Sequence, residues 1–177
     1  DADSNVISAP VNVGTYSVEI IYNYSSTEIF TITNTYTIEK ETIADSDVTV
    51  SDDVIYDRAD HTPDITIMVN TLALVRDRDY TVKFYRDGVE TTDFTNAGTI
   101  TIIVEGINNY FGTVTKEYVI AKAEIKDSDV TVSGDMIYDA QEHKPVIGVV
   151  VNGLTLVQDV DYTVKFYRDG VETDDFT

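Results

Sequence analysis

Closely spaced carboxylates are the residues of this chain best suited to chemistry. They come as Asp-x-Asp pairs, and each pair occurs twice along the chain. Alternate residues of a strand lie on one face about 6–7 Å apart, and carboxylate oxygens are ligands that Ca²⁺ prefers. The sequence therefore offers eight candidate calcium ligands, which are Asp45, Asp47, Asp77, Asp79, Asp127, Asp129, Asp159 and Asp161.

A solvated acidic face is the simpler interpretation of the same pairs, because the chain has no EF-hand loop. Paired carboxylates also serve as acid and base in glycosidases. Pairs that recur in every repeat, on short strands, suit a spacer better than an active site. We therefore expect no catalytic residues and no enzymatic activity, and Ca²⁺ is the one cofactor kept as a candidate.

Histidine and tyrosine are the other residues with possible chemistry. His61 and His143 each stand two residues before a proline, and without an HExxH motif or any cysteine we interpret them as turn residues. Tyrosines on strands usually pack half-buried with the hydroxyl in water. Glycan-binding modules use aromatic platforms, so such a module stays an alternative, with Tyr22, Tyr24, Tyr85, Tyr110 and Tyr167 as its candidates.

The charge of the chain excludes two classes of partner. A formal net charge of -20 repels phosphate backbones and anionic lipid, so we expect no nucleic-acid partner and no membrane-surface binding. No apolar run reaches the ~18 residues of a membrane span, so we expect no membrane insertion. Residues 1–10 lack a signal-peptide pattern, and we expect the segment to be cut from a longer precursor.

Apolar and polar residues alternate along most of the chain, which predicts strands. Tyr80, Val82 and Phe84 face one way and the residues between them the other. The sequence predicts further strands at 47–50, 54–56, 64–69, 72–75, 100–104 and 113–122, and Asp87-Gly88 predicts a tight turn. About seven short strands per repeat predict an all-β, Ig-like sandwich, with β-grasp-like or small barrel repeats as alternatives.

An internal repeat governs the organisation of the chain. Tyr80 to Thr91 returns unchanged as Tyr162 to Thr173, an offset of 82. Between 45–95 and 127–177, 36 of 51 positions are identical without a gap.

The repeat extends towards the start of the chain. Asn12-Val-Gly-Thr15 matches Asn96-Ala-Gly-Thr99 at an offset of 84, and Tyr36 to Lys40 matches Tyr118 to Lys122 at 82. The earlier copy therefore carries two extra residues around Tyr22 to Ser26.

Two frames fit this repeat. In the preferred frame, 1–95 and 96–177 are two sandwich modules of about 82 residues. In the alternative frame, 1–42 is partial, 43–124 is a complete repeat and 125–177 is partial. Partial repeats would expose apolar faces and unpaired backbone, which another copy would complete by strand addition.

The order of the repeated motifs resembles a known family. Those motifs are Ile55-Tyr56-Asp57, His61-Thr-Pro63, Asp79-Tyr-Thr-Val82, Asn96-Ala-Gly98, Asn109-Tyr-Phe-Gly112 and Tyr118-Val-Ile-Ala-Lys122. Over essentially the whole chain they resemble the Ig-like tandem repeats of bacterial surface proteins called MBG or YDG repeats. The resemblance implies an extracellular adhesin of the cell surface or cell wall, whose partners are neighbouring repeats of the same polypeptide.

Three roles follow as expectations. The first is a non-catalytic structural stalk or spacer of a bacterial adhesin. The second is a self-assembling fibre subunit whose partial repeats are completed by other copies of the chain. The third is a module that binds a host or plant glycan.

Overall fold

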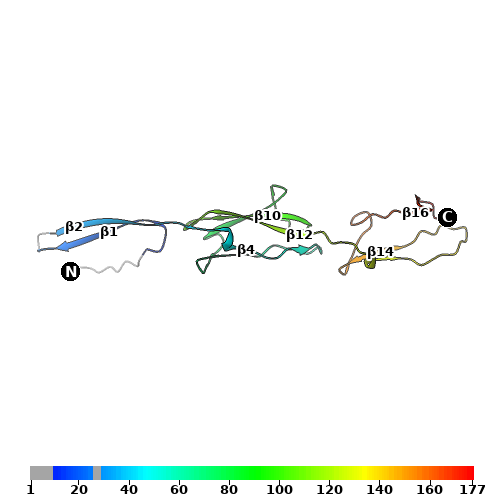
Figure 1. The fold of residues 1–177 in the computed structure, drawn as a ribbon, viewed down its shortest axis with the longest axis horizontal. Helices are drawn as coiled ribbons and strands as arrows, with labels where there is room; N and C mark the ends of the chain where they lie inside the picture. Colours follow the sequence, from blue (N-terminus) through cyan, green and yellow to red (C-terminus); the bar gives the residue numbers. More distant parts are fainter. Residues whose placement is uncertain (1–9, 26–28) are drawn as a thin grey trace. The chain divides into compact units, whose positions relative to one another are not determined.

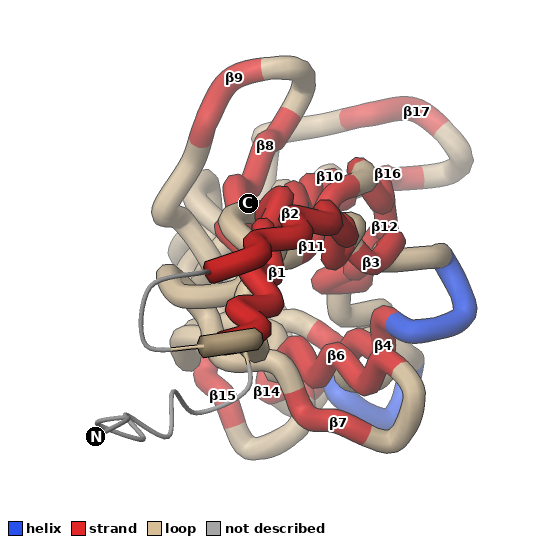
Figure 2. Tube along the Cα trace, turned by 90° about the vertical axis from the view of Figure 1, so that its left-hand side faces the viewer, coloured by secondary structure: helices blue, strands red, loops and turns tan. Residues whose placement is uncertain are grey.

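The computed structural model describes residues 10–25 and 29–177. In this part of the chain the only helical residues lie in two short 3₁₀ helices, η1 (Asp45–Asp47) and η2 (Asp127–Asp129), and Figure 2 shows strands and loops elsewhere. The expected all-β fold is confirmed. The two extra residues expected around Tyr22 to Ser26 fall partly on 26–28, outside the described residues. No helix of the described part is long and apolar enough to span a membrane.

A long antiparallel hairpin opens the described part of the chain. Strand β1 (Gly14–Asn23) pairs with β2 (Ile29–Ile38) over ten residues, as a two-stranded ribbon (Figure 1). Directly opposed residues share a face, so the register places Tyr16 with Tyr36 and Ile20 with Ile32 on one face. The other face carries mostly threonine and serine. We call β1 and β2 the N-terminal hairpin.

Two sheets follow, which we call the central sandwich. One has three strands in the order β4 (Val48–Val50), β6 (Ile65–Val69) and β7 (Leu72–Ala73). The other has five in the order β5 (Val54–Ile55), β12 (Thr113–Ala121), β10 (Gly98–Gly106), β8 (Tyr80–Arg86) and β9 (Val89–Glu90). A small parallel pair joins β3 (Glu41–Thr42) to β11 (Tyr110–Phe111).

The strand order of the larger sheet matches the G-F-C-C′ order of immunoglobulin-like sandwiches, with β12, β10, β8 and β9 in those places. Strand β5 pairs with β12 in parallel at the edge of this sheet. The expected strands at 54–56, 64–69 and 113–122 are present within a residue at each end. Two expectations were wrong: Asp47 belongs to η1 rather than to a strand, and β7 ends at Ala73 rather than at residue 75.

Strands β10 and β12 supply a large part of the core of the central sandwich. Ile100, Ile102 and Val104 on β10 are each 0% exposed, because alternate residues of the strand all face inward. On β12, Tyr118 is 2% and Ile120 1% exposed. Burying a side chain of this size stabilises the fold by about 1.5–3 kcal/mol, so these two strands supply much of the apolar core.

Tight turns of left-handed backbone connect the hairpins. Asp87 and Gly88 have φ of 51° and 77° between β8 and β9, positive at both central residues as in a type I′ turn, so the tight turn that the sequence predicted is present. Thr71 takes the same conformation between β6 and β7, with φ of 70°. A β-branched residue is strained in this region, and the corresponding residue of the next repeat is Gly153.

The residues after β12 form a second set of short strands, which we call the C-terminal segment (122–177). Strand β13 (Val130–Val132) pairs with β14 (Ile147–Val151), which pairs with β15 (Leu154–Thr155). Separately, β16 (Tyr167–Arg168) pairs with β17 (Val171–Glu172). These strands correspond to β4, β6, β7, β8 and β9 of the central sandwich.

By their internal contacts the residues group into two compact units. The first holds the described residues up to 53 together with 62–92 and 99–119, and the second holds 54–61, 93–98 and 120–177. Neither frame of the repeat coincides with these units. Both divisions of the chain, 1–95 with 96–177 and 43–124 with flanking partial repeats, therefore stay predictions.

Candidate functional site

The first acidic pair lies in a 3₁₀ turn. Asp47 Oδ2 accepts the backbone N–H of Ala44 at 2.8 Å, and the Asp47 N–H donates to the Ala44 carbonyl at 3.1 Å. Asp45 Oδ1 lies 2.7 Å from the Lys116 ammonium. Because η1 is helical, the spacing expected of alternate strand carboxylates does not apply. The pair closes the turn that leads into β4.

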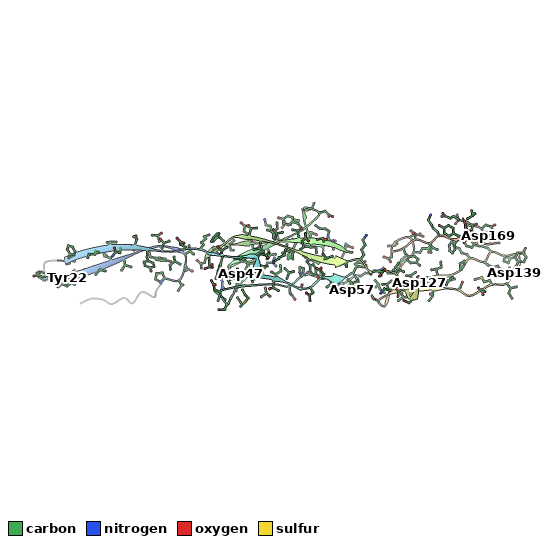
Figure 3. The ribbon with its side chains drawn as sticks, viewed as in Figure 1. Tyr22, Asp47, Asp57, Asp127, Asp139 and Asp169 are labelled. Atoms are coloured by element: carbon green, nitrogen blue, oxygen red, sulfur yellow. The ribbon has the colours of Figure 1, made fainter. Side chains whose placement is uncertain are left out.

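The same turn recurs in the second repeat. Asp129 Oδ2 accepts the backbone N–H of Lys126 at 2.9 Å, and Asp127 begins η2. Figure 3 shows Asp47 and Asp127 at these two turns. The repeated Asp-Ser-Asp motif is thus a local capping device, because a side-chain oxygen satisfies a backbone donor at the start of a helical turn.

The second acidic pair stands in the loop before β8. Asp79 is only 6% exposed and accepts the backbone N–H of Val75 at 2.8 Å. The Arg78 guanidinium lies 2.7 Å from its carboxylate and, as the main cause, lowers the pKa of Asp79. Asp77 takes a left-handed backbone conformation with φ of 64°. This loop positions Tyr80, whose pKa is raised chiefly by burial.

The corresponding loop of the second repeat keeps the carboxylate and changes its cation. Asp161 Oδ2 accepts the Val157 N–H at 2.7 Å, and Asp159 has φ of 65°. Val160 stands where the first repeat has Arg78, and the guanidinium of Arg58 lies 2.7 Å from Asp161 instead. The Asp-x-Asp pairs of both repeats therefore hold a turn through a backbone donor.

Sequence reasoning missed both arginines. Arg78 is adjacent to Asp79, so its spacing was a usable signal, whereas Arg58 is separated from Asp161 by 103 positions and offered none. Within residues 10–25 and 29–177, no group of three or more histidine or acidic residues is placed to hold a metal ion. Calcium binding at the eight candidate aspartates stays a hypothesis, and the backbone N–H groups that Asp47, Asp79, Asp129 and Asp161 already accept in their turns argue against it.

Each histidine pairs with the aspartate four residues before it. His61 Nε2 lies 2.7 Å from Asp57 Oδ1, and His143 Nε2 lies 2.7 Å from Asp139 Oδ1. The Asp57 carboxylate also accepts the Ala59 N–H, and this bond is the main cause of its lowered pKa, followed by His61. The geometry repeats in both copies, and each pair closes a loop.

The loops with histidine are also tied to the end of their own repeats. The His61 N–H donates to the Phe94 carbonyl at 2.9 Å, and the His143 N–H donates to the Phe176 carbonyl at 3.0 Å. The arrangement can orient an imidazole. It serves a structural turn in both copies.

The candidate tyrosines divide by exposure. Tyr22, Tyr24 and Tyr167 are 61%, 74% and 60% exposed, whereas Tyr85 and Tyr110 are half-buried. Tyr22 lies at the end of the N-terminal hairpin (Figure 3), and its ring centroid is 6.3 Å from that of Tyr24. Glycan binding at these rings stays a prediction.

One hollow of about 890 Å³ lies beside Arg78 and Asp79. Its polar lining groups are engaged with one another: the Asn109 amide donates to Asn12 Oδ1 at 3.1 Å, and Asn109 Oδ1 accepts the Val13 N–H at 3.0 Å. Together with the Arg78 ion pair, these bonds fix the base of the N-terminal hairpin. They assign no ligand to the hollow.

Comparisons of the chain with protein-family models, with curated proteins and with solved structures found no match.

Proposed function

We propose that the chain is a non-catalytic structural segment of an extracellular bacterial surface protein, in which modules of about 82 residues repeat along a stalk or spacer. One observation carries the proposal. The repeat preserves the residues that build cores and turns, and 36 of 51 aligned positions are identical. Its acidic pairs and histidines act within those turns in both copies.

Mechanical unfolding of single molecules tests this role. A concatemer of the chain would be stretched between a surface and a force probe. An extended residue spans at most about 3.3–3.6 Å, so a module of 82 residues predicts regular steps near 270–295 Å, less the length of the folded module. Rupture events without a regular increment would contradict a chain of mechanical modules.

Location is tested separately. Antibodies raised against the chain, applied to intact cells of its source organism, should label the surface without permeabilisation. Labelling that appears only after permeabilisation would remove the extracellular role. The resemblance of the motif order to adhesin repeats supports the surface location. The preserved tandem repeat supports the mechanical role.

A second candidate, a self-assembling fibre subunit, is favoured by the N-terminal hairpin. Val18, Ile20 and Ile32 are 45%, 53% and 47% exposed on one face of it. Apolar faces of this kind mark interaction surfaces. Light scattering across a concentration series tests it, because a subunit that exchanges strands forms larger species on concentration and a simple spacer stays monomeric.

A further inference from the structure

We infer that the ion pair between Arg58 and Asp161 is a contact between consecutive repeats that restricts their relative orientation, and that the residue before the aspartate decides whether it forms. Where that residue is arginine, as at Arg78, the aspartate is neutralised within its own repeat. Where it is valine, as at Val160, the aspartate binds the arginine of the preceding repeat. The inference rests on the proposed role as a stalk or spacer and adds what holds its modules in line.

The strand order brings the loop of Arg58 to the boundary between the repeats. Strand β5 pairs in parallel with the end of β12, with Val54 opposite Ile120. Parallel strands run in the same direction, so the loop after β5 leaves the sheet at the same end as the linker 122–126, which leads into the second repeat. The Tyr56 N–H donates to the Ala121 carbonyl at 2.8 Å, which ties the loop to the start of that linker.

Residues of both repeats share one compact unit at this boundary. By internal contacts, 54–61 of the first repeat groups with 120–177. Within this unit Tyr56, Leu154 and Leu156 line a hollow of about 240 Å³, so side chains of the first repeat lie beside a turn of the second. The two repeats therefore meet through a packed surface as well as through the covalent linker.

Electrostatics explains why a cation is useful at this surface. The chain has 32 acidic and 12 basic residues, so neighbouring repeats repel each other. Arg58 Nη2 lies 2.7 Å from Asp161 Oδ2, and the two side chains are 39% and 18% exposed. The same carboxylate oxygen accepts the Val157 N–H at 2.7 Å, which fixes the acceptor in place. Arg58 thus places an attractive contact where the net charge is repulsive.

The backbone of the loop is the same in both repeats, and the side chain at its tip differs. Arg58 and Ala140 occupy equivalent positions with φ of 69° and 63°. In each loop the preceding aspartate, Asp57 or Asp139, accepts the N–H two residues later and pairs with the histidine four residues later. Because alanine builds the same loop, the loop does not require the arginine. The guanidinium is therefore a feature of the contact rather than of the turn.

The two aspartates show why residue 160 selects the source of the cation. Arg78 Nη2 lies 2.7 Å from Asp79 Oδ2, the same oxygen type that Arg58 approaches on Asp161. Val160 stands at the position of Arg78 and carries no charge. An arginine there would compete with Arg58 for one carboxylate oxygen. Valine leaves that oxygen to the preceding repeat.

Distances between spin labels on the two repeats test the contact. Thr49→Cys and Thr131→Cys place labels at equivalent, exposed positions of β4 and β13, in a chain without other cysteines. We expect a narrow distance distribution in the labelled parent. In Arg58→Ala the share of molecules outside the main peak should rise about two- to fivefold, the effect of losing a typical exposed ion pair. Salt at about 1 M should broaden the parent distribution too, because it screens exposed charges.

Val160→Arg is the decisive variant. It supplies a cation within the second repeat, as Arg78 does in the first, so Asp161 stays neutralised while Arg58 is released. We expect it to broaden the distribution as Arg58→Ala does. Arg78→Ala is the matched control, because it removes an equally short ion pair inside the first repeat, and it should leave the distribution narrow.

A parent distribution as broad as that of Arg58→Ala, or a Val160→Arg distribution as narrow as that of the parent, would overturn the inference. Equal broadening by Arg78→Ala would also overturn it, since it would indicate a general effect of charge. Hydrogen exchange in β10 verifies that each variant keeps the central sandwich, and Tm should hardly change because exposed ion pairs add little stability.

The contact and the mechanical role fail separately. Regular steps in the stretched concatemer would survive loss of the ion pair, because each module unfolds by itself. Irregular steps together with a narrow distribution in the parent would remove the stalk and leave the contact between the repeats in place.

Discussion

Tyr118 and Tyr36 occupy equivalent positions of the repeat. Truncating each side chain in turn compares a tyrosine in a packed core with one on an exposed face. Tyr118 is 2% exposed in the central sandwich, whereas Tyr36 is 41% exposed on the N-terminal hairpin. We predict that Tyr118→Ala destabilises the central sandwich severely and that Tyr36→Ala leaves it almost unchanged.

The magnitude follows from the burial. An aromatic side chain buries 150–250 Å², and about 200 Å² at ~25 cal/mol per Å² gives ~5 kcal/mol as an upper bound. Residual compactness of the unfolded chain reduces this by about 10–40%, so we expect a loss of about 3–4.5 kcal/mol for Tyr118→Ala, within the range for large aromatic truncations. For Tyr36→Ala, which lies outside the sandwich core, the expected change is within about 0.5 kcal/mol.

Urea denaturation at low protein concentration, followed by far-ultraviolet circular dichroism, measures both losses. Hydrogen exchange resolved to β10 identifies which transition belongs to the central sandwich. Tyr36 also stacks on Tyr16 with ring centroids 5.4 Å apart, so Tyr36→Ala should raise exchange in the hairpin. Equal losses of sandwich stability for the two variants would refute the assignment of one tyrosine to a core and the other to an open face.

Three further predictions concern the turns. Asp79→Asn should lower the free energy of unfolding by about 1–2 kcal/mol at pH 7, because hydrogen bonds to a charged partner are lost. The pKa of Asp79 is lowered in the folded state, so its stabilisation exists above the unfolded pKa of about 3.9 and is lost as pH falls through the folded pKa. A difference in Tm between the two proteins that persists unchanged at low pH would contradict the ion pair. Thr71→Gly should stabilise the β6–β7 turn by about 1 kcal/mol, because Thr71 has φ of 70°. The opposite change at the equivalent position, Gly153→Thr, should destabilise the C-terminal segment. A lower Tm for Thr71→Gly would refute the claim that Thr71 is strained. Adding millimolar Ca²⁺ to chelated protein should leave Tm unchanged, because Asp47, Asp79, Asp129 and Asp161 already accept backbone donors in their turns, and a rise of several degrees would establish the calcium site.

Period-two alternation predicted the strands of the central sandwich well, because their alternate residues are divided between core and solvent. Ile100, Ile102 and Val104 show the pattern in its simplest form. The Asp87-Gly88 turn was predictable for a different reason, since glycine accepts positive φ without strain. The 3₁₀ turn that contains Asp47 was not predictable, because a single turn of 3₁₀ helix leaves no periodic signal in the sequence.

Contacts between distant residues were the other limit of prediction. The parallel pairs β5–β12 and β3–β11 join segments far apart in the chain, and nothing in either strand encodes its partner. In the second acidic loop Val160 stands at the position of Arg78, and the distant Arg58 supplies the cation for Asp161 instead. A repeat can thus preserve a carboxylate and its turn while the charge that balances it changes.

The identical stretches 80–86 and 162–168 carry the wider argument. Seven residues with the same side chains form a full strand when β10 lies beside them and only a fragment when it does not. Edge backbone groups need a partner, so strand state in this chain is decided by pairing between parts of the repeat rather than by propensity. A protein built of such repeats has its weakest point wherever one half of a module lacks the other.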